Sequence, residues 1–455
     1  MDEKLIQCLN QVSAEQLADI IKTIYGMDDN VDHKIEAALF PAGSGYIVEQ
    51  LEARIASIEQ DDDFISYRDV STYSMQLDYL VDDIASLVDT NPEKAFHLIN
   101  RFINTHEDTF NRSDDSGEMG DSYSRAVDIW LLAAQAWQSN GSCSLVWAEE
   151  LKQRHYSDDY GVWYGRIADS KALLGDVVLR TLAKEFEDDY CQLSKQESKS
   201  NQYRASCARY GIEQVARALG DIELYEHAFL IEPSALNDAQ KEKIVRFCLQ
   251  QQDGQAALKW LTGSWDDGLR SYTRKELLEE AYQLTGQTEE LIRIRSEAYR
   301  QDPCYRNLQA LLEVLPEQDR TPVLQGAAEQ ALKIKYFSSR IDTLIDLGEI
   351  EQAVEQLLQY GFQEGVIAYG NLLRWTEVFA NAEYYLAEVA CYRLLLLDIL
   401  NEGRSKAYGY AADYYQNLAR LDTRVDDYQP LASWQEFQAE LKNRHGRKYS
   451  FWNRL

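Results

Sequence analysis

The sequence predicts an all-α protein organised as a helical-hairpin repeat array, a tetratricopeptide-like (TPR-like) α-solenoid with a less regular N-terminal helical region. Two observations carry this prediction: the residues that open helices recur in a recognisable pattern, and glycines that suit helix ends recur at a regular interval. Composition agrees, because Leu, Ala, Glu and Gln are common while proline occurs only 7 times in 455 residues.

Four stretches have the pattern of an N-terminal capping box, in which Ser or Thr is followed three residues later by Glu or Gln. The two side chains then satisfy backbone N–H groups that the first turn of a helix leaves free. Each stretch precedes apolar residues at three- and four-residue spacing, which is typical of an amphipathic helix. The stretches are Ser13–Gln16, Thr90–Glu93, Thr273–Glu276 and Ser433–Glu436.

The glycines keep a period in the low thirties, which is the length of a tetratricopeptide-type hairpin. A glycine suits the left-handed position that ends a helix, and a new apolar helix follows several of them. One glycine of this series is missing near Pro316–Pro322, where two prolines indicate a break in the array. Helix pairs in a non-repeating bundle would give similar spacing and stay an alternative. The glycines are Gly141, Gly175, Gly220, Gly254, Gly286 and Gly348.

Charge and regularity divide the chain into three predicted parts: an acidic N-terminal helical region (1–115), the repeat array (121–428) and a basic aromatic C-terminal cap (429–455). Residues 1–125 carry 26 acidic and 9 basic side chains, a net −17, whereas residues 401–455 carry 7 and 9, a net +2. The polar segment 111–117 is the expected flexible link, and 194–201 is a second expected break.

The formal net charge of −30 argues against direct binding of nucleic acid or membrane by the body of the protein, because such a surface repels phosphates and anionic lipid. No segment has 18 uninterrupted apolar residues, and the N-terminus lacks the pattern of a signal peptide. Seven scattered cysteines without a CxxC motif do not indicate a disulfide framework. We therefore expect a cytoplasmic protein with reduced cysteines.

The C-terminal helix that begins at Ser433 is expected to carry Trp434, Phe437 and Leu441 on one stripe, and a basic aromatic end follows it. Two interpretations stay open. The segment either folds back as a cap over the last apolar groove of the array, or it forms a docking surface for an acidic protein or nucleic acid.

The same end of the chain resembles the closing segment of an uncharacterised family of bacterial α-helical proteins related to SWIM-type zinc-finger proteins, and the helix at 17–21 is weakly similar to it as well. The resemblance implies a helical-repeat body and a bacterial origin, and it brings no activity. The paired cysteines and terminal histidine of a SWIM finger have no counterpart, so no zinc is expected. The matching residues are Arg404–Tyr408, Ala411–Ala412, Tyr414–Tyr415, Leu441, His445–Lys448 and Phe451–Trp452.

Residue patterns that carry catalysis or bind cofactors are missing. GxGxxG and GxxxxGK[ST] phosphate loops are absent, no two of the six histidines have metal-ligand spacing, and no GxSxG motif presents a nucleophile. His106-Glu107-Asp108 places a base beside carboxylates, but adjacent residues on a helix point apart. We therefore predict no catalytic, cofactor-binding or metal-binding residues.

Aromatic and basic residues are the candidates for partner binding. Aromatic stripes are typical of a hairpin core, although Tyr and Trp also anchor peptides on a concave face. The candidates are Trp130, Trp137, Trp163, Tyr160, Tyr164, Arg447, Lys448, Phe451 and Trp452.

The predicted function is a non-enzymatic protein–protein interaction scaffold that binds a partner segment in the concave face of its superhelix. The alternative is a regulator of nucleic-acid machinery that acts through the basic tail or as an acidic polymer mimic. An enzyme on an unrecognised helical scaffold is a third class.

Overall fold

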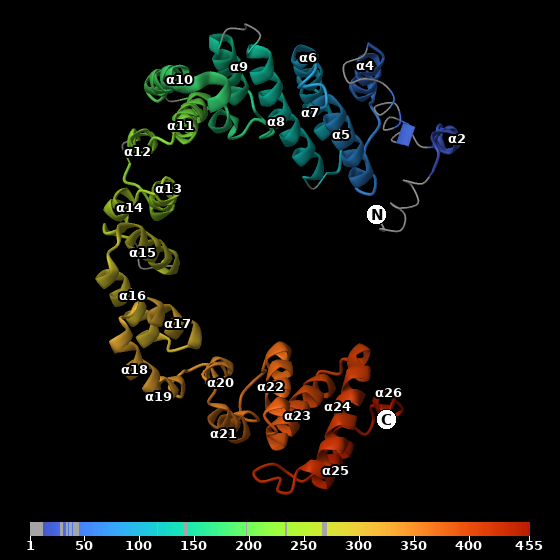
Figure 1. Ribbon diagram of the computed structural model, residues 1–455, viewed down its shortest axis with the longest axis vertical. Helices are drawn as coiled ribbons and strands as arrows, with labels where there is room; N and C mark the ends of the chain where they lie inside the picture. Colours follow the sequence, from blue (N-terminus) through green and yellow to red (C-terminus); the bar gives the residue numbers. More distant parts are fainter. Residues whose placement is uncertain are drawn as a thin grey trace. The chain divides into compact units, whose positions relative to one another are not determined.

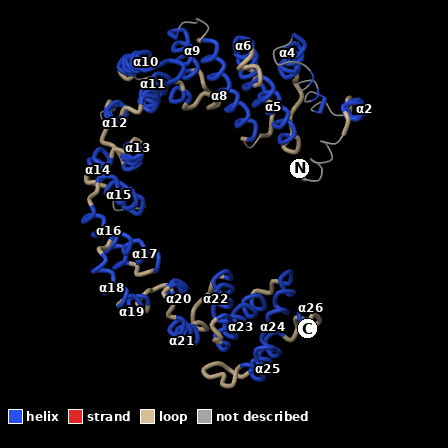
Figure 2. Tube along the Cα trace, viewed as in Figure 1, coloured by secondary structure: helices blue, strands red, loops and turns tan. Residues whose placement is uncertain are grey.

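The computed structural model describes residues 12–27, 31–32, 35, 39, 45–115, 117–139, 144–196, 198–232, 234–265 and 271–455. Within these ranges the chain is α-helical without a strand, and its one isolated β-bridge joins Ile65 and Ser113 (Figures 1 and 2). Helices pack mostly on their neighbours in the sequence, which confirms the predicted all-α repeat architecture. The chain forms two compact units, residues 1–251 and 252–455.

In the first unit, α6 and α5 pack against α8, and α10 packs against α11. The described helices of this unit are α2 (Ala14–Ile24), α4 (Gly45–Gln60), α5 (Val70–Ala85), α6 (Pro92–Ile103), α7 (His106–Asn111), α8 (Glu118–Gln138), α9 (Ser144–Tyr156), the 3-10 turn η1 (Arg166–Asp169), α10 (Lys171–Leu193), α11 (Lys199–Leu219), α12 (Ile222–Leu230) and α13 (Asp238–Gln250).

One continuous core runs through this unit, from Ile47 on α4 to Ala228 on α12. The predicted flexible link at 111–117 includes the described residue Arg112, which contacts the region before α5 and α5 itself. Arg112 forms an ion pair with Asp61 at 2.9 Å and donates to the hydroxyl of Tyr73 at 2.7 Å. Helices on both sides of the segment share one core. That the segment is a flexible link stays a prediction.

In the second unit, the described helices continue the same neighbour-on-neighbour packing, with α22 against α23 and α23 against α24. They are α14 (Gly254–Leu261), α15 (Ser271–Thr285), α16 (Thr288–Gln301), α17 (Tyr305–Val314), α18 (Glu317–Gln325), α19 (Ala327–Ala331), α20 (Phe337–Asp346), α21 (Ile350–Tyr360), α22 (Tyr369–Asn381), α23 (Tyr385–Asn401), η2 (Ser405–Ala407), α24 (Tyr408–Leu421), η3 (Asp422–Arg424), α25 (Trp434–His445) and α26 (Tyr449–Trp452).

Helix α23 lies at the centre of the main core of this unit. Apolar residues occur on nearly all of its faces, as expected for a helix covered on several sides, and Val389, Leu396 and Leu400 are buried. The core continues through α24 and α25 to Phe451 of α26. The C-terminal segment is therefore part of the packed unit.

Two of the four predicted capping boxes form, at Ser13 and Ser433. The prediction at Thr90 is wrong by one residue, because Asn91 caps α6 and Pro92 occupies the first helical position. The prediction at Thr273 is also wrong, since α15 begins at Ser271 and Thr273 lies inside it. A further capping box at Asn237, with Gln240 as its partner, was not predicted.

The periodic glycines serve two different purposes. Gly220, Gly286 and Gly348 follow helix ends at φ values of 68°, 67° and 80°, where an L side chain is strained. Gly254 instead opens α14, and a Cβ there would lie 2.8 Å from Cγ2 of Thr285, so its role is close packing. Gly141 lies outside the described residues.

The predicted proline break holds at Pro316, which precedes α18, whereas Pro322 lies inside that helix. The chain also breaks between α10 and α11, as expected for 194–201, and Ser198 caps α11. Across the described ranges, no helix combines the length and apolarity needed to cross a bilayer. The three-part division at 115 and 428 stays a prediction.

Candidate functional site

The predicted tryptophans form a cluster in the first unit. Trp130 is fully buried, its ring lies 5.3 Å from that of Trp163, and its Nε1 donates to Oδ1 of Asn100 at 2.9 Å. Trp163 is 5% exposed and Trp137 is half-buried. Trp130 and Trp163 therefore serve the core, the interpretation that the sequence left open beside binding, and they offer no surface to a partner.

The two predicted tyrosines are exposed. Tyr160 donates its hydroxyl to Oδ1 of Asn111 at 2.7 Å, and the ring of Tyr164 stacks on Tyr210 with the centroids 4.7 Å apart. Both keep accessible ring surface, so they stay predicted contacts.

The predicted residues of the C-terminal tail also differ in burial. Phe451 is fully buried near the rings of Tyr408 and Tyr415, and Nε1 of Trp452 donates to the carbonyl of His445 at 2.9 Å. Arg447 and Lys448 form no ion pair with any residue that the structure describes, and Arg447 is exposed. Phe451 thus belongs to the core of the second unit, while Arg447 is exposed and Lys448 is half-buried.

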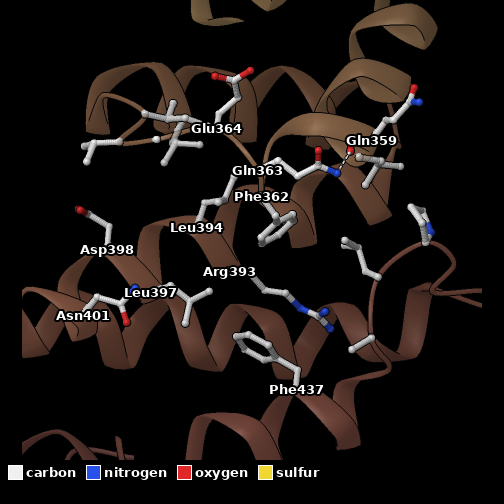
Figure 3. A pocket seen from close by; sticks show the side chains of 18 of the residues that line it. Gln359, Phe362, Gln363, Glu364, Arg393, Leu394, Leu397, Asp398, Asn401 and Phe437 are labelled. Atoms are coloured by element: carbon white, nitrogen blue, oxygen red, sulfur yellow. Dashed lines mark hydrogen bonds between the residues drawn. The ribbon is translucent and has the colours of Figure 1, made fainter. Parts of the chain in front are cut away.

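A cavity of about 1060 Å³ in the second unit is the strongest candidate site, and sequence analysis did not predict it. Its walls come from the end of α21, the loop that follows it, α23, the 430–432 loop and α25 (Figure 3). Much of the wall is apolar. The apolar side chains include Leu358, Phe362, Ile367, Leu394, Leu397, Leu431 and Phe437.

Arg393 provides the charge inside this cavity. It extends from α23 between Phe362 and Phe437 (Figure 3), and it is only 3% exposed. Its guanidinium carbon lies 4.4 Å from the ring centroid of Phe437 and 5.4 Å from that of Tyr428. Burial lowers the pKa of Arg393 to about 10, so the side chain stays cationic at neutral pH.

The guanidinium of Arg393 has no acceptor for two of its nitrogens. Nε and Nη2 are both buried and without a hydrogen-bond partner among the described residues. The other buried arginine of the described chain is Arg295, which is 8% exposed and bonds to Glu279, Glu313 and the carbonyl of Ala310. A buried cation without acceptors is energetically costly, which makes Arg393 the exception that calls for an explanation.

Acidic side chains surround the cavity. Its lining holds five carboxylates and two arginines, a net −3. Asp398 pairs with Arg404, and Glu440 pairs with Arg444 at 2.8 Å. The other three carboxylates are exposed and form no ion pair among the described residues. They are Glu355, Glu364 and Glu402.

The remaining polar groups of the lining are amides. Nε2 of Gln363 donates to the carbonyl of Gln359 at 3.1 Å, and Asn401 lies at the opposite end of the cavity (Figure 3). The lining, all within described residues, contains no His, Cys, Ser, Thr, Tyr or Lys. These groups suit hydrogen bonding to a polar ligand.

Outside this cavity, two histidines of the first unit contact backbone carbonyls. Nδ1 of His106 lies 2.8 Å from the carbonyl oxygen of Ile103, a contact within its own helical region. His155 contacts the carbonyl of Cys207 at 2.8 Å, and burial lowers its pKa. In the described part of the chain, no three His, Cys, Asp or Glu side chains are placed to hold a metal ion.

A sequence signal for Arg393 exists in retrospect. With Val389, Leu396 and Leu400 it falls at spacings of four, three and four residues, which place it on a buried stripe of α23. Arginine is common on helix surfaces, where its stem lies along apolar residues and its head reaches water. The spacing alone did not distinguish these cases.

The architecture defines the class of this protein as an all-α chain of helices packed on their sequence neighbours. It belongs to the family of unknown function DUF6880, whose model matches residues 6–454. The family match does not connect the chain to SWIM zinc-finger proteins or to tetratricopeptide repeats. No curated protein matches the sequence.

Proposed function

We propose that this chain is a non-catalytic binding protein that takes a segment of a partner protein into the cavity of its second unit. The observation that carries the proposal is Arg393, a buried cation without acceptors on an apolar wall. Sites that bind ligands are commonly concave and mostly apolar, with a few polar groups that fix orientation. The cavity between α21, α23 and α25 has this character.

Two features favour binding over catalysis at this cavity. The lining lacks the side chains that most often act as nucleophiles or as a general base near neutral pH. The volume of about 1060 Å³ lies at the upper end of the roughly 300–1,000 Å³ typical of ligand sites, which leaves room for several residues of a peptide. The proposal places recognition here and not on the tryptophan cluster.

A second candidate function is regulation of nucleic-acid machinery through the tail. It is favoured by one observation, the exposed Arg447 beside Tyr449, which is 71% exposed. Basic and stacking side chains together suit single-stranded nucleic acid. Binding through such a tail weakens steeply with salt, whereas binding through a buried pocket does not.

Site-specific photocrosslinking in the native host tests the proposal. The photoreactive residue p-benzoylphenylalanine replaces Phe362, which is 39% exposed and lines the cavity, or Tyr336, which is 76% exposed and does not. We expect a protein adduct from position 362 that position 336 does not give. Equal adducts at both positions, or none at 362, would contradict the proposal.

Variants with Arg447→Glu and Lys448→Glu separate the two candidates. The tail cannot simply be removed, because Phe437 and Leu441 of α25 belong to the core of the second unit. Charge reversal leaves those residues in place. If recognition lies in the cavity, the adduct at position 362 persists; if it lies in the tail, the adduct is lost.

A further inference from the structure

We infer that the cavity recognises the free C-terminal carboxylate of a peptide that carries Lys or Arg shortly before its end. This inference rests on the proposed function and names the chemistry of the partner. It follows from which edge of the Arg393 guanidinium has no acceptor, from the charges at the mouth of the cavity and from the hydrogen-bonding groups along its wall.

The unpaired nitrogens of Arg393, Nε and Nη2, form one edge of the guanidinium. That edge presents two parallel N–H groups whose spacing matches the oxygens of a carboxylate. Arg300 in this chain uses the same two nitrogens on Glu297, at 2.9 and 2.7 Å, and Arg101 does so on Glu59. Arg393 therefore presents the same fork without its carboxylate.

Aromatic rings limit how an anion reaches this fork. Phe437 and Tyr428 contact the guanidinium through cation–π geometry, and such contacts occupy its faces. A planar acceptor that approaches within the guanidinium plane fits the remaining edge. A carboxylate has this shape and makes two hydrogen bonds at once.

The mouth of the cavity selects against a simple anion. Glu355, Glu364 and Glu402 are exposed and unpaired within the described chain, so they repel a ligand of uniform negative charge. A peptide with a carboxylate at its tip and a cationic side chain behind it satisfies both regions. A bare anion would also leave most of about 1060 Å³ unfilled.

A chain end suits the cavity better than an internal Asp or Glu. An internal acidic residue brings two arms of backbone toward the apolar wall, and each buried N–H and C=O then needs a partner. A C-terminus brings one arm. The amides of Gln359, Gln363 and Asn401 line the cavity and offer donors and acceptors to that arm (Figure 3).

The probe is a library of octapeptides with random sequence, made with a free C-terminal carboxylate and, separately, with a C-terminal amide. Each pool is equilibrated with the full-length protein, and bound peptides are identified by mass spectrometry. We expect enrichment from the free-acid pool alone, with Lys or Arg within four residues of the end. Individual enriched peptides should bind about 30-fold more weakly, or worse, as amides.

Variants locate the interaction. Arg393→Met should weaken the enriched free-acid peptides about 30-fold or more, and Arg393→Lys should restore only part of this, because lysine lacks the fork. The matched control is Arg374→Met, which removes an exposed arginine of α22 outside the cavity and should leave binding unchanged. Joint replacement of Glu355, Glu364 and Glu402 by Gln should weaken basic peptides about threefold to tenfold.

The outcomes separate this inference from the proposed function. Equal enrichment from the amide pool, binding that survives Arg393→Met, or no enrichment at all would overturn the carboxylate assignment. The comparison of acid and amide pools uses the unaltered protein, so it does not depend on the folding of a variant. A crosslink at position 362 together with carboxylate-independent binding would retain the proposed function and reject the inference.

Discussion

Replacing Arg393 by methionine should stabilise the ligand-free protein, which is unusual for a change at a buried position. Burial lowers the pKa of Arg393 to about 10, which corresponds to a penalty of about 3 kcal/mol for holding the charged form in the fold. Methionine fills similar space without a charge, but it forfeits cation–π contacts with Phe437 and Tyr428 worth about 0.5–2 kcal/mol. The net expectation is an increase of about 1–2 kcal/mol in the free energy of unfolding.

Scanning calorimetry and hydrogen exchange together measure this increase. The transition that includes the second unit should rise by roughly 2–8 °C for a unit of this size. Exchange of peptides covering 385–401 should slow in parallel, which assigns the gain to α23. At neutral pH both measurements should show Arg393→Met to be more stable than wild type. Both are made on the full-length chain.

The dependence on pH has a defined sign. Because burial lowers the pKa of Arg393 to about 10, the native guanidinium loses its proton at a lower pH than the guanidinium of the unfolded chain. In the pH range between these two deprotonations, unfolding takes up a proton. The stability of wild type then rises with pH, and the difference in free energy of unfolding between Arg393→Met and wild type narrows. A gap that widens over this range would contradict the assignment of the penalty to a buried charge.

Arg295→Met is the matched control, because Arg295 is also buried but has carboxylate and carbonyl acceptors. Its removal strands those acceptors, and a loss of about 1–3 kcal/mol is expected. If Arg393→Met destabilised the protein to the same extent, the Arg393 guanidinium would have hydrogen-bond acceptors within the fold. It would then not be an unpaired fork for a ligand.

Four further substitutions test the packing, capping and hydrogen-bonding assignments by chemical denaturation. Gly254→Ala should cost about 1–3 kcal/mol, because its Cβ would lie 2.8 Å from Cγ2 of Thr285, whereas Gly370→Ala has open space within a helix and should gain about 0.5–1 kcal/mol. Ser433→Ala should cost about 1 kcal/mol through loss of its capping box, and exchange at the start of α25 should accelerate. Tyr123→Phe should cost about 1–2 kcal/mol, since the hydroxyl bonds to two threonines at 2.7 and 3.0 Å. Burial raises the pKa of Tyr123 to about 12, so wild type should lose this advantage between pH 10 and 12 as the unfolded phenol ionises first.

Local chemistry explains which helix starts could be predicted from the sequence. Ser433 has its glutamate partner three residues on and no better cap beside it, and the predicted box forms. At Thr90 the next residue, Asn91, is a stronger cap and is followed by a proline that suits the first helical position. At Thr273 the helix starts two residues earlier, at Ser271, so no cap is needed there. The capping residue can therefore be predicted from sequence only where no neighbouring residue competes for the N-cap position.

The candidate site could not be predicted in the same way, because its elements are distant in sequence. Arg393 lies on α23, yet its burial depends on Phe437 of α25 and on Tyr428 in the preceding loop. Whether an arginine on a helix reaches water or stays enclosed depends on what packs beyond it. The tail was recognised from sequence as a possible cap, but its contribution to a cavity wall was not.

The net charge and the proposed ligand agree once surface and interior are treated separately. At physiological salt, screening limits the reach of an exposed charge to about 8 Å. Most of the net charge of −30 therefore acts on molecules that approach the surface of the protein. That surface favours a basic segment. Arg393 is shielded from solvent, and its attraction for a carboxylate acts only after the chain end has entered. The acidic mouth of the cavity and the buried cation therefore select different groups of one ligand. Its basic side chains stay outside, and its C-terminal carboxylate binds within.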